Sequence, residues 1–148
     1  MSEPICKVAD IIYVRFELTE FEEQKKYFDH FGLMLAYEDE NSIFFRGSGT
    51  SPYAYVATKG KENKYIGTAY KANDYSDLEA LSKEFNVDIV ENKEPGGGHK
   101  VTVIDPDGIE VEVCYGMTPA EPVAVVSKVL NTGPVSYTHL TLPTNREV

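Results

Sequence analysis

The fold of this chain is decided by residues 101–115, which read VTVIDPDGIEVEVCY. Two alternating runs flank a tight turn, in which Pro106 presets the backbone of the first central position and Gly108 takes a positive φ. This pattern predicts a bulged β-hairpin. Asp105 and Asp107 then serve the turn rather than a cation, because no further acidic residues follow at the spacing of a calcium-binding loop.

The second strand of the hairpin carries different chemistry on its two faces, because alternate residues of a strand point in opposite directions. One face holds Ile109, Val111, Val113 and Tyr115, and the other holds Glu110 and Glu112. We expect the apolar face to meet a helix-covered core and the acidic face to line a cleft.

The length of the chain limits the number of domains, and its charge limits the class of partner. Its 148 residues allow one compact domain with a real core, but not a second full domain. The formal net charge of −10 argues against nucleic acid and anionic membranes, since both need clustered Lys and Arg. It leaves room for a small-molecule ligand, a cationic one included, and for a homo-oligomer.

The cysteines and the start of the chain bear on its compartment. Cys6 and Cys114 are isolated and have neither metal-type nor redox-type spacing, so they are read as two reduced thiols. The first residues do not form a signal peptide, and no apolar run approaches the length of a membrane span. We expect a cytoplasmic protein.

Residues 11–59 have the order β-α-β-β-β. Thr19 is predicted to cap a helix, with Glu22 completing a capping box, and Gly32 is predicted to end that helix in the left-handed conformation. The alternating runs place the strands at residues 11–18, 33–37, 42–46 and 53–58.

Residues 65–115 repeat this plan at an offset of 54, which pairs Ile12 with Ile66. The same offset pairs Thr19 with Asn73, both helix-capping residues, and Gly32 with Asn86, both suited to a left-handed helix end. A helix is predicted from about Asp74 to Phe85, and the later strands at residues 87–90, 100–104 and 109–115. The fold class is therefore α+β: two tandem βαβββ modules form one curved, eight-stranded mixed sheet, with helices outside and a cleft on the other face.

The paired modules, the helix end Phe31-Gly32-Leu33 and the closing sequence DPDGIEVE of residues 105–112 resemble the vicinal oxygen chelate superfamily. That superfamily includes glyoxalase I, bleomycin-resistance proteins and type I extradiol dioxygenases. The resemblance covers residues 8–117. Within the superfamily, residues 13–16 and the glycine run 96–98 are most similar to the N-terminal half of two-domain, extradiol-dioxygenase-like proteins.

The resemblance implies where a metal would be held. In the metal-dependent members, His and Glu on the first and last strands of the modules bind a divalent ion, and these positions fall on Tyr13, Gly67 and Glu112. The predicted strand 53–58 contains no His, Asp or Glu. Because a catalytic metal generally needs about three protein ligands, we predict no metal site, no cofactor site and no catalytic residue in this chain.

Other polar residues carry weaker signals. His30 falls in the last turn of the first helix, which favours a solvated surface role. His99 follows Gly96-Gly97-Gly98, which we interpret as a flexible loop rather than a phosphate cradle. Two interpretations stay open for the polar residues on the cleft face: they line a ligand cleft, or Arg15 neutralises the nearby carboxylates. These residues are Tyr13, Arg15, Glu17, Glu110 and Glu112.

The end of the chain departs from the repeat. Residues 118–134 have the composition of a linker. Residues 135–148 resemble translated sequencing-adaptor sequence, so we exclude them, His139 included, from the fold.

Two functional hypotheses follow. In the first, the chain is the metal-free N-terminal half of a truncated ring-cleavage dioxygenase that acts on catechol-type substrates, with iron or manganese in the missing C-terminal half; the fragment alone would be inactive. In the second, it is a stand-alone, metal-free protein similar to bleomycin-resistance proteins, which dimerises and holds a cationic drug in an acidic groove.

Overall fold

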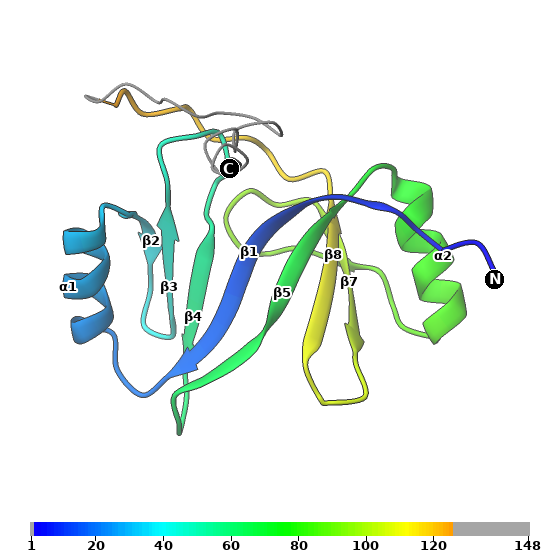
Figure 1. Cartoon of the computed structure of the whole chain (residues 1–148), viewed down its shortest axis with the longest axis horizontal. Coiled ribbons are helices and arrows are strands. Elements are labelled where there is room, and N and C mark those ends of the chain that lie inside the picture. The colour runs from blue at the N-terminus through cyan, green and yellow to red at the C-terminus, as the bar shows by residue number, and fades with distance from the viewer. Residues whose placement is uncertain (1, 126–148) are drawn as a thin grey trace, which may run out of the picture.

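The computed structural model describes residues 2–125, which form two helices and eight strands (Figure 1). The first module holds β1 (Val8–Leu18), α1 (Glu22–Phe31), β2 (Met34–Glu38), β3 (Ser42–Arg46) and β4 (Tyr55–Lys59). The second module holds β5 (Lys64–Ala72), α2 (Tyr75–Phe85), β6 (Val90–Glu91), β7 (His99–Ile104) and β8 (Glu110–Tyr115).

All eight strands belong to one sheet in the order β2-β3-β4-β1-β5-β8-β7-β6, so the predicted α+β architecture is confirmed. The two modules meet where β1 pairs antiparallel with β5, and each of these strands also pairs in parallel with the last strand of its own module. Val14 lies opposite Thr68, its counterpart at the offset of 54. The sequence repeat therefore corresponds to a pseudo-two-fold axis in the structure, which passes through this pair and relates the two modules.

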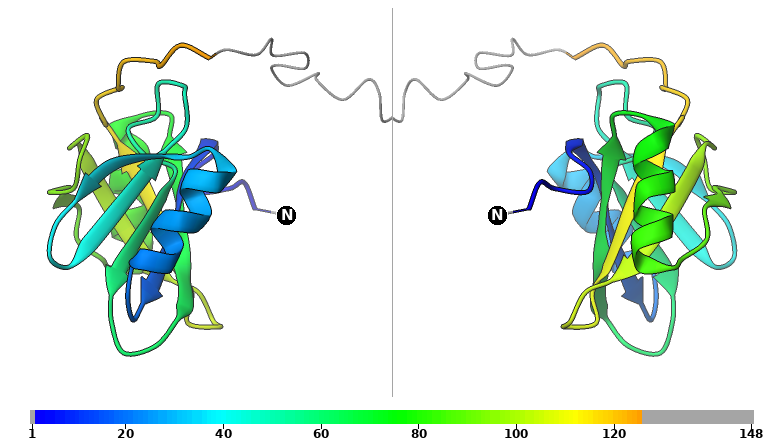
Figure 2. Two further views of the ribbon diagram at one scale, coloured as in Figure 1. Left: turned by 90° about the vertical axis from the view of Figure 1, so that its left-hand side faces the viewer. Right: turned by 90° about the vertical axis from the view of Figure 1, so that its right-hand side faces the viewer.

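The helices cover the two ends of one sheet face (Figures 1 and 2). Beneath α1, a cluster of Phe21, Phe28, Ile43, Phe45, Tyr55 and Ala57 is buried. Beneath α2, the buried cluster is Ala72, Leu78, Leu81, Val101 and Val113. Val113 therefore faces a helix, as its place in the alternation predicts.

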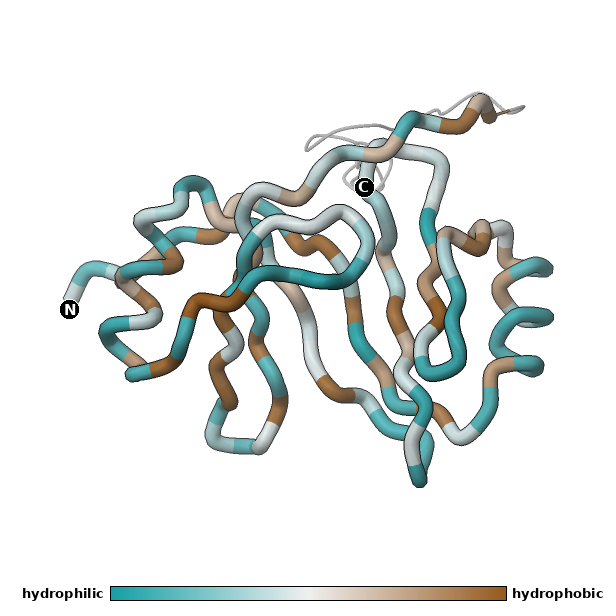
Figure 3. Tube along the Cα trace, turned by 180° about the vertical axis from the view of Figure 1, so that it is seen from behind, coloured by the Kyte–Doolittle hydropathy of each residue, from teal (hydrophilic) through white to brown (hydrophobic). Residues whose placement is uncertain are grey.

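The opposite, concave face has a buried core of its own and is partly covered by a loop. Its buried cluster consists of Tyr13, Phe44, Tyr53, Val56, Ala69 and Cys114. The loop between β6 and β7 crosses the sheet, and Figure 3 draws its first part in the hydrophilic colour and its second part near white. This loop fills part of the space where the sequence predicts an open cleft.

The hairpin forms as predicted. The amide of Gly108 donates to the carbonyl of Asp105 at 3.0 Å, and Gly108 has a φ of 86°. A side-chain oxygen of Asp105 accepts from the amides of Asp107 and Ile109 at 2.8 and 2.9 Å. The Asp105 carboxylate is thus used within the turn.

The predicted start of the first helix is wrong. The residue before α1 is Phe21, which makes no side-chain cap. Thr19 instead bonds Asn63: its amide and its hydroxyl both donate to the side-chain oxygen of Asn63, at 2.9 and 3.2 Å. A tertiary contact has therefore taken the group that would have capped the helix.

The second helix begins one residue later than predicted. Asp74, not Asn73, is the N-cap, and it forms a capping box with Asp77. The Asn73 side chain donates to the carbonyl of Lys7 instead. Both predicted helix ends are confirmed, since Gly32 and Asn86 have φ values of 100° and 53°.

The segment after β8 contacts the first module. The amides of Ala120 and Val123 donate to the carbonyls of Thr50 and Ser48, at 2.7 and 2.8 Å. Arg46 also donates to the carbonyl of Glu121 at 2.8 Å. The rest of the predicted linker and the predicted tail lie outside the described residues.

Val113→Ala should lower the free energy of unfolding by about 1–3 kcal/mol, because Val113 is only 4% exposed and packs under α2. Ile104→Ala, on the paired strand of the same hairpin but 58% exposed, is the control and should change stability much less. Urea denaturation measures both. Equal losses would contradict the assignment of Val113 to the core.

Candidate functional site

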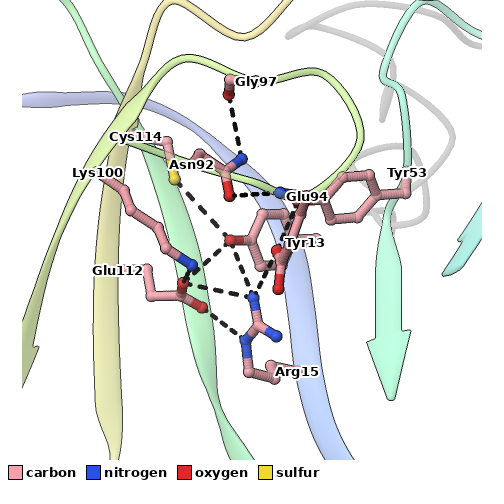
Figure 4. Close-up of polar contacts among 9 residues, drawn as sticks. All are labelled: Tyr13, Arg15, Tyr53, Asn92, Glu94, Gly97, Lys100, Glu112 and Cys114. Atoms are coloured by element: carbon pink, nitrogen blue, oxygen red, sulfur yellow. Dashed lines mark hydrogen bonds and ion pairs between the residues drawn. The ribbon is translucent and has the colours of Figure 1, made fainter. Parts of the chain in front are cut away.

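The polar centre of the concave face is a connected cluster of side chains from five segments (Figure 4). Tyr13 and Arg15 come from β1, Lys100 from β7, Glu112 and Cys114 from β8, Glu94 from the loop between β6 and β7, and Tyr53 from the residues before β4. We call these residues the concave cluster.

Small residues on β5 allow these side chains to meet. β5 lies between β1 and β8. Ala69 of β5 pairs with Tyr13 on β1 and with Glu112 on β8. In the same way, Gly67 pairs with Arg15 and with Glu110. Neither Ala69 nor Gly67 carries a side chain long enough to fill the space above β5, so Tyr13 and Arg15 reach across it to Glu112.

Glu112 is 2% exposed and accepts hydrogen bonds from three residues. Its Oε1 accepts from Lys100 Nζ at 2.6 Å and from the Tyr13 hydroxyl at 3.1 Å, and its Oε2 accepts from Arg15 Nε at 2.9 Å. Burial would raise the pKa of this carboxyl, but the charges and hydrogen bonds of Arg15 and Lys100 outweigh burial and hold the pKa below its usual range. Glu112 is therefore a buried, paired carboxylate.

Arg15 ties the sheet to the loop above it. Its Nη2 donates to Glu94 Oε2 at 2.8 Å, and the Tyr53 hydroxyl donates to the same oxygen at 3.0 Å. Burial would lower the pKa of Arg15, yet the hydrogen bonds to Glu94 and Glu112 raise it above its ordinary value. The cluster holds two cations and two carboxylates, so its formal charge is balanced.

The cluster offers no activated nucleophile. Burial, followed by the neighbouring Cys114 and Glu112, raises the pKa of Tyr13, which stays a neutral phenol. Burial and then Glu112 raise the pKa of Cys114 to about 11, so it is a thiol at neutral pH. Arg15 and Tyr53 both bond Glu94 and so hold its loop over the sheet.

The positions implied for a metal do not fit one. Tyr13 donates to Glu112, and Glu112 already pairs with two cations. At Gly67 an added Cβ would lie 2.0 Å from the backbone oxygen of Glu110, so no side chain can enter there without moving the backbone. Within residues 2–125, no group of three or more His, Cys, Asp or Glu side chains could hold a metal ion.

The remaining sequence candidates lie apart from the cluster. His30 is exposed in the last turn of α1, and His99 is exposed beside Tyr75, with ring centroids 5.7 Å apart. Glu17 accepts from the amides of Lys61 and Glu62. Of the two interpretations of the polar face, neutralisation by Arg15 holds for Glu112, whereas Glu17 and Glu110 make no contact with Arg15 in the described hydrogen bonds.

The glycine run is held in place, which corrects its interpretation as a flexible loop. All three of its glycines have positive φ. The carbonyls of Gly96 and Gly98 accept from the amides of Thr118 and Asn92, both at 2.8 Å. A Cβ on Gly98 would lie 2.5 Å from the backbone oxygen of Tyr115, so the loop depends on glycine to pack against the end of β8.

Four members of the concave cluster were not predicted as site residues: Tyr53, Glu94, Lys100 and Cys114. Lys100 could have been predicted from the register of the hairpin. Thr102 lies opposite Glu112, and Lys100, two residues before Thr102, lies on the same face of the strand. Glu94 lies in a loop, where no periodicity fixes the direction of a side chain. Tyr53 falls inside the predicted strand at residues 53–58, but β4 begins only at Tyr55, and Tyr53 packs in a different core from Tyr55.

Two βαβββ modules that share one sheet, with helices on one face and a polar centre on the other, define the vicinal oxygen chelate fold. Solved structures match it over about four-fifths of this chain. The Mn(II)-bound glyoxalase from Novosphingobium aromaticivorans is 23% identical, with a TM-score of 0.71, over 81% of this chain and 43% of that one.

Homoprotocatechuate 2,3-dioxygenases also match. The enzyme from Brevibacterium fuscum, in complex with 3,4-dihydroxyphenylacetate, is 22% identical with a TM-score of 0.72, over 81% of this chain and 40% of that one. The enzyme from Arthrobacter globiformis is 25% identical with a TM-score of 0.68, over 83% of this chain and 41% of that one. The chain therefore matches one domain-sized part of a glyoxalase and of extradiol dioxygenases, less than half of their length.

Sequence comparisons add little to this. No protein-family model matches the chain. A stretch of 83 residues, 56% of this chain, is 28% identical to a probable phosphoglucosamine mutase from Methanosphaera stadtmanae, of which it covers 16%. Within the described residues, no helix is both long and apolar enough to cross a membrane.

Gly67→Ala should lower the free energy of unfolding by about 1–3 kcal/mol or more, because the new Cβ meets backbone atoms of Glu110. Gly47→Ala is the matched control, since nothing lies within 4 Å of its added Cβ, and it should change stability by less than about 0.5 kcal/mol. Urea denaturation compares them. A fully stable Gly67→His variant would show that this ligand position is open after all.

Glu112→Gln should lower the free energy of unfolding at pH 7 by about 3 kcal/mol, because it leaves two partly buried cations with one carboxylate between them. The folded pKa of Glu112 is depressed, so its contribution is complete above the unfolded value and is lost as the pH falls through the folded one. The difference in free energy of unfolding between wild type and variant, measured by urea denaturation from pH 7 to pH 3, should shrink as the pH falls below about 4.5, the ordinary pKa of a glutamate. A difference that does not change with pH would contradict the pairing.

Proposed function

We propose that this chain is the non-catalytic, N-terminal domain of a two-domain protein similar to extradiol ring-cleavage dioxygenases. On this proposal a second paired-module domain holds iron or manganese, and the intact protein cleaves a catechol-type ring with dioxygen. The domain described here contributes structure and not chemistry, and no step of the reaction is assigned to its residues.

The concave cluster is the observation that carries this proposal. The one retained ligand position, Glu112, is buried and paired with Arg15 and Lys100, and Glu94 fastens a loop over it. Such a face supports a structural role. The lengths support it as well, because the matched dioxygenase chains are covered over only about 40% of their length.

The alternative is a stand-alone binding protein similar to bleomycin-resistance proteins, which holds a cationic molecule in an acidic groove. The net charge of −10 favours it. The concave cluster argues against it, because Glu94 and Glu112 are already matched by Arg15 and Lys100. A cation at the centre of this face would have to displace one of them.

Anaerobic titration with Fe(II) and, separately, Mn(II) should show no stoichiometric binding, because Arg15 and Lys100 occupy the carboxylate that a metal would need. Calorimetry and elemental analysis after dialysis measure it, with Glu112→Gln as the matched control. About one tight ion per wild-type chain, lost in the control, would overturn the proposal.

The reading frame of the source gene beyond residue 125 is the second test. A further pair of modules, with His, His and Glu at positions equivalent to Tyr13, Gly67 and Glu112, is the expected finding. A stop codon in the natural gene, together with dimerisation and binding of a cationic drug, would favour the alternative.

A further inference from the structure

A second candidate site lies on the helix-bearing face, away from the concave cluster. A pocket of about 460 Å³ opens there, lined by the aromatic side chains Phe16, Tyr55 and Tyr65 and by the polar side chains Gln24, Asn63 and Lys64. β1 ends and β5 begins side by side at this end of the sheet (Figure 1). The volume is within the range of pockets that take small organic molecules, roughly 300–1,000 Å³.

The aromatic residues form a connected wall. Phe16 stacks on Tyr55, with ring centroids 5.3 Å apart and planes inclined by 20°, and meets Tyr65 edge-on at 5.5 Å. Tyr65 is 40% exposed, so part of this wall faces solvent. A flat aromatic ligand can extend such a wall by offset or edge-to-face contacts.

The hydroxyl of Tyr55 makes no hydrogen bond to another group of residues 2–125. The residue is only 7% exposed, and its ring packs edge-on against Phe28 at 4.6 Å, yet no hydrogen bond to its hydroxyl is found within residues 2–125. Buried polar groups are nearly always hydrogen-bonded, and an exception calls for an explanation. Because Tyr55 lines the pocket, a ligand there can supply the missing partner.

The charges around the pocket restrict the ligand. Lys64 is paired with Glu62 at 2.8 Å and lies 3.9 Å from Glu17, so its charge is compensated. Gln24 and Asn63 are neutral, and the Asn63 side-chain oxygen is used by Thr19. Burial raises the pKa of Tyr55 to about 12, so its hydroxyl is a neutral donor at physiological pH.

We propose that this pocket binds a planar, uncharged aromatic molecule that accepts a hydrogen bond from the Tyr55 hydroxyl. The site is on the face opposite the concave cluster and does not depend on a metal or on a second domain. Its test is therefore independent of the tests of the proposed function.

The test is a titration of the purified chain with coumarin, a planar, uncharged molecule with one carbonyl acceptor, followed by two-dimensional NMR. The expected result is saturable shifts at Phe16, Asn63 and Tyr65 and none at Arg15 or Lys100. Coumarin-3-carboxylate should bind more weakly, because the pocket has no uncompensated cation for it. Absence of saturable shifts, shifts confined to the concave cluster, or tighter binding of the carboxylate would overturn the proposal.

Two isosteric variants separate binding from stability. Tyr55→Phe removes only the unpartnered hydroxyl, so coumarin affinity should fall about fivefold, the effect of one neutral hydrogen bond, while the urea midpoint stays the same or rises. Tyr53→Phe removes a hydroxyl that donates to Glu94, so the urea midpoint should fall while coumarin affinity is unchanged. Unchanged affinity in Tyr55→Phe, or an equal loss in Tyr53→Phe, would rule out the proposed contact.

Discussion

The antiparallel pairing of β1 with β5 is the contact on which the rest of the structure depends. It joins two modules, each with only half of the sheet, and places Val14 opposite its repeat counterpart Thr68. The concave cluster exists only because of this junction, since its β1 members bond Glu112 of the other module across β5. Small residues on β5 are therefore as necessary to the cluster as the charged residues themselves.

Burying an ion pair seldom adds much stability compared with an apolar core, because desolvation of the charges offsets their attraction. The concave cluster limits that cost by giving Glu112 donors from Lys100, Tyr13 and Arg15. The cluster also positions the loop between β6 and β7. Arg15 bonds both Glu112 of the sheet and Glu94 of the loop, and so fixes where the loop crosses the concave face. The same contacts make the centre of this face unsuited to a metal.

How far the sequence predicts this molecule depends on the range of the contacts involved. The hairpin turn at residues 105–108 is local chemistry and forms as expected. The internal repeat predicts the sheet, because strands that are equivalent in the two modules should have equivalent pairing partners. Thr19 fails as a helix cap because a residue in another loop, Asn63, binds it. Glu94 is absent from the predicted site for the same reason: only the folded loop brings it to Arg15.

Tyr53 and Tyr55 show how the two faces of the sheet differ chemically. They are two residues apart at the start of β4, yet Tyr53 belongs to the concave core and Tyr55 to the core beneath α1. Tyr53 donates to Glu94, while no partner of the Tyr55 hydroxyl is found in the part of the chain that the structure describes. The centre of the concave face is thus occupied by polar side chains that are hydrogen-bonded to one another. Tyr55, by contrast, lies on the face that carries the helices, in the lining of the pocket for which we propose an aromatic ligand.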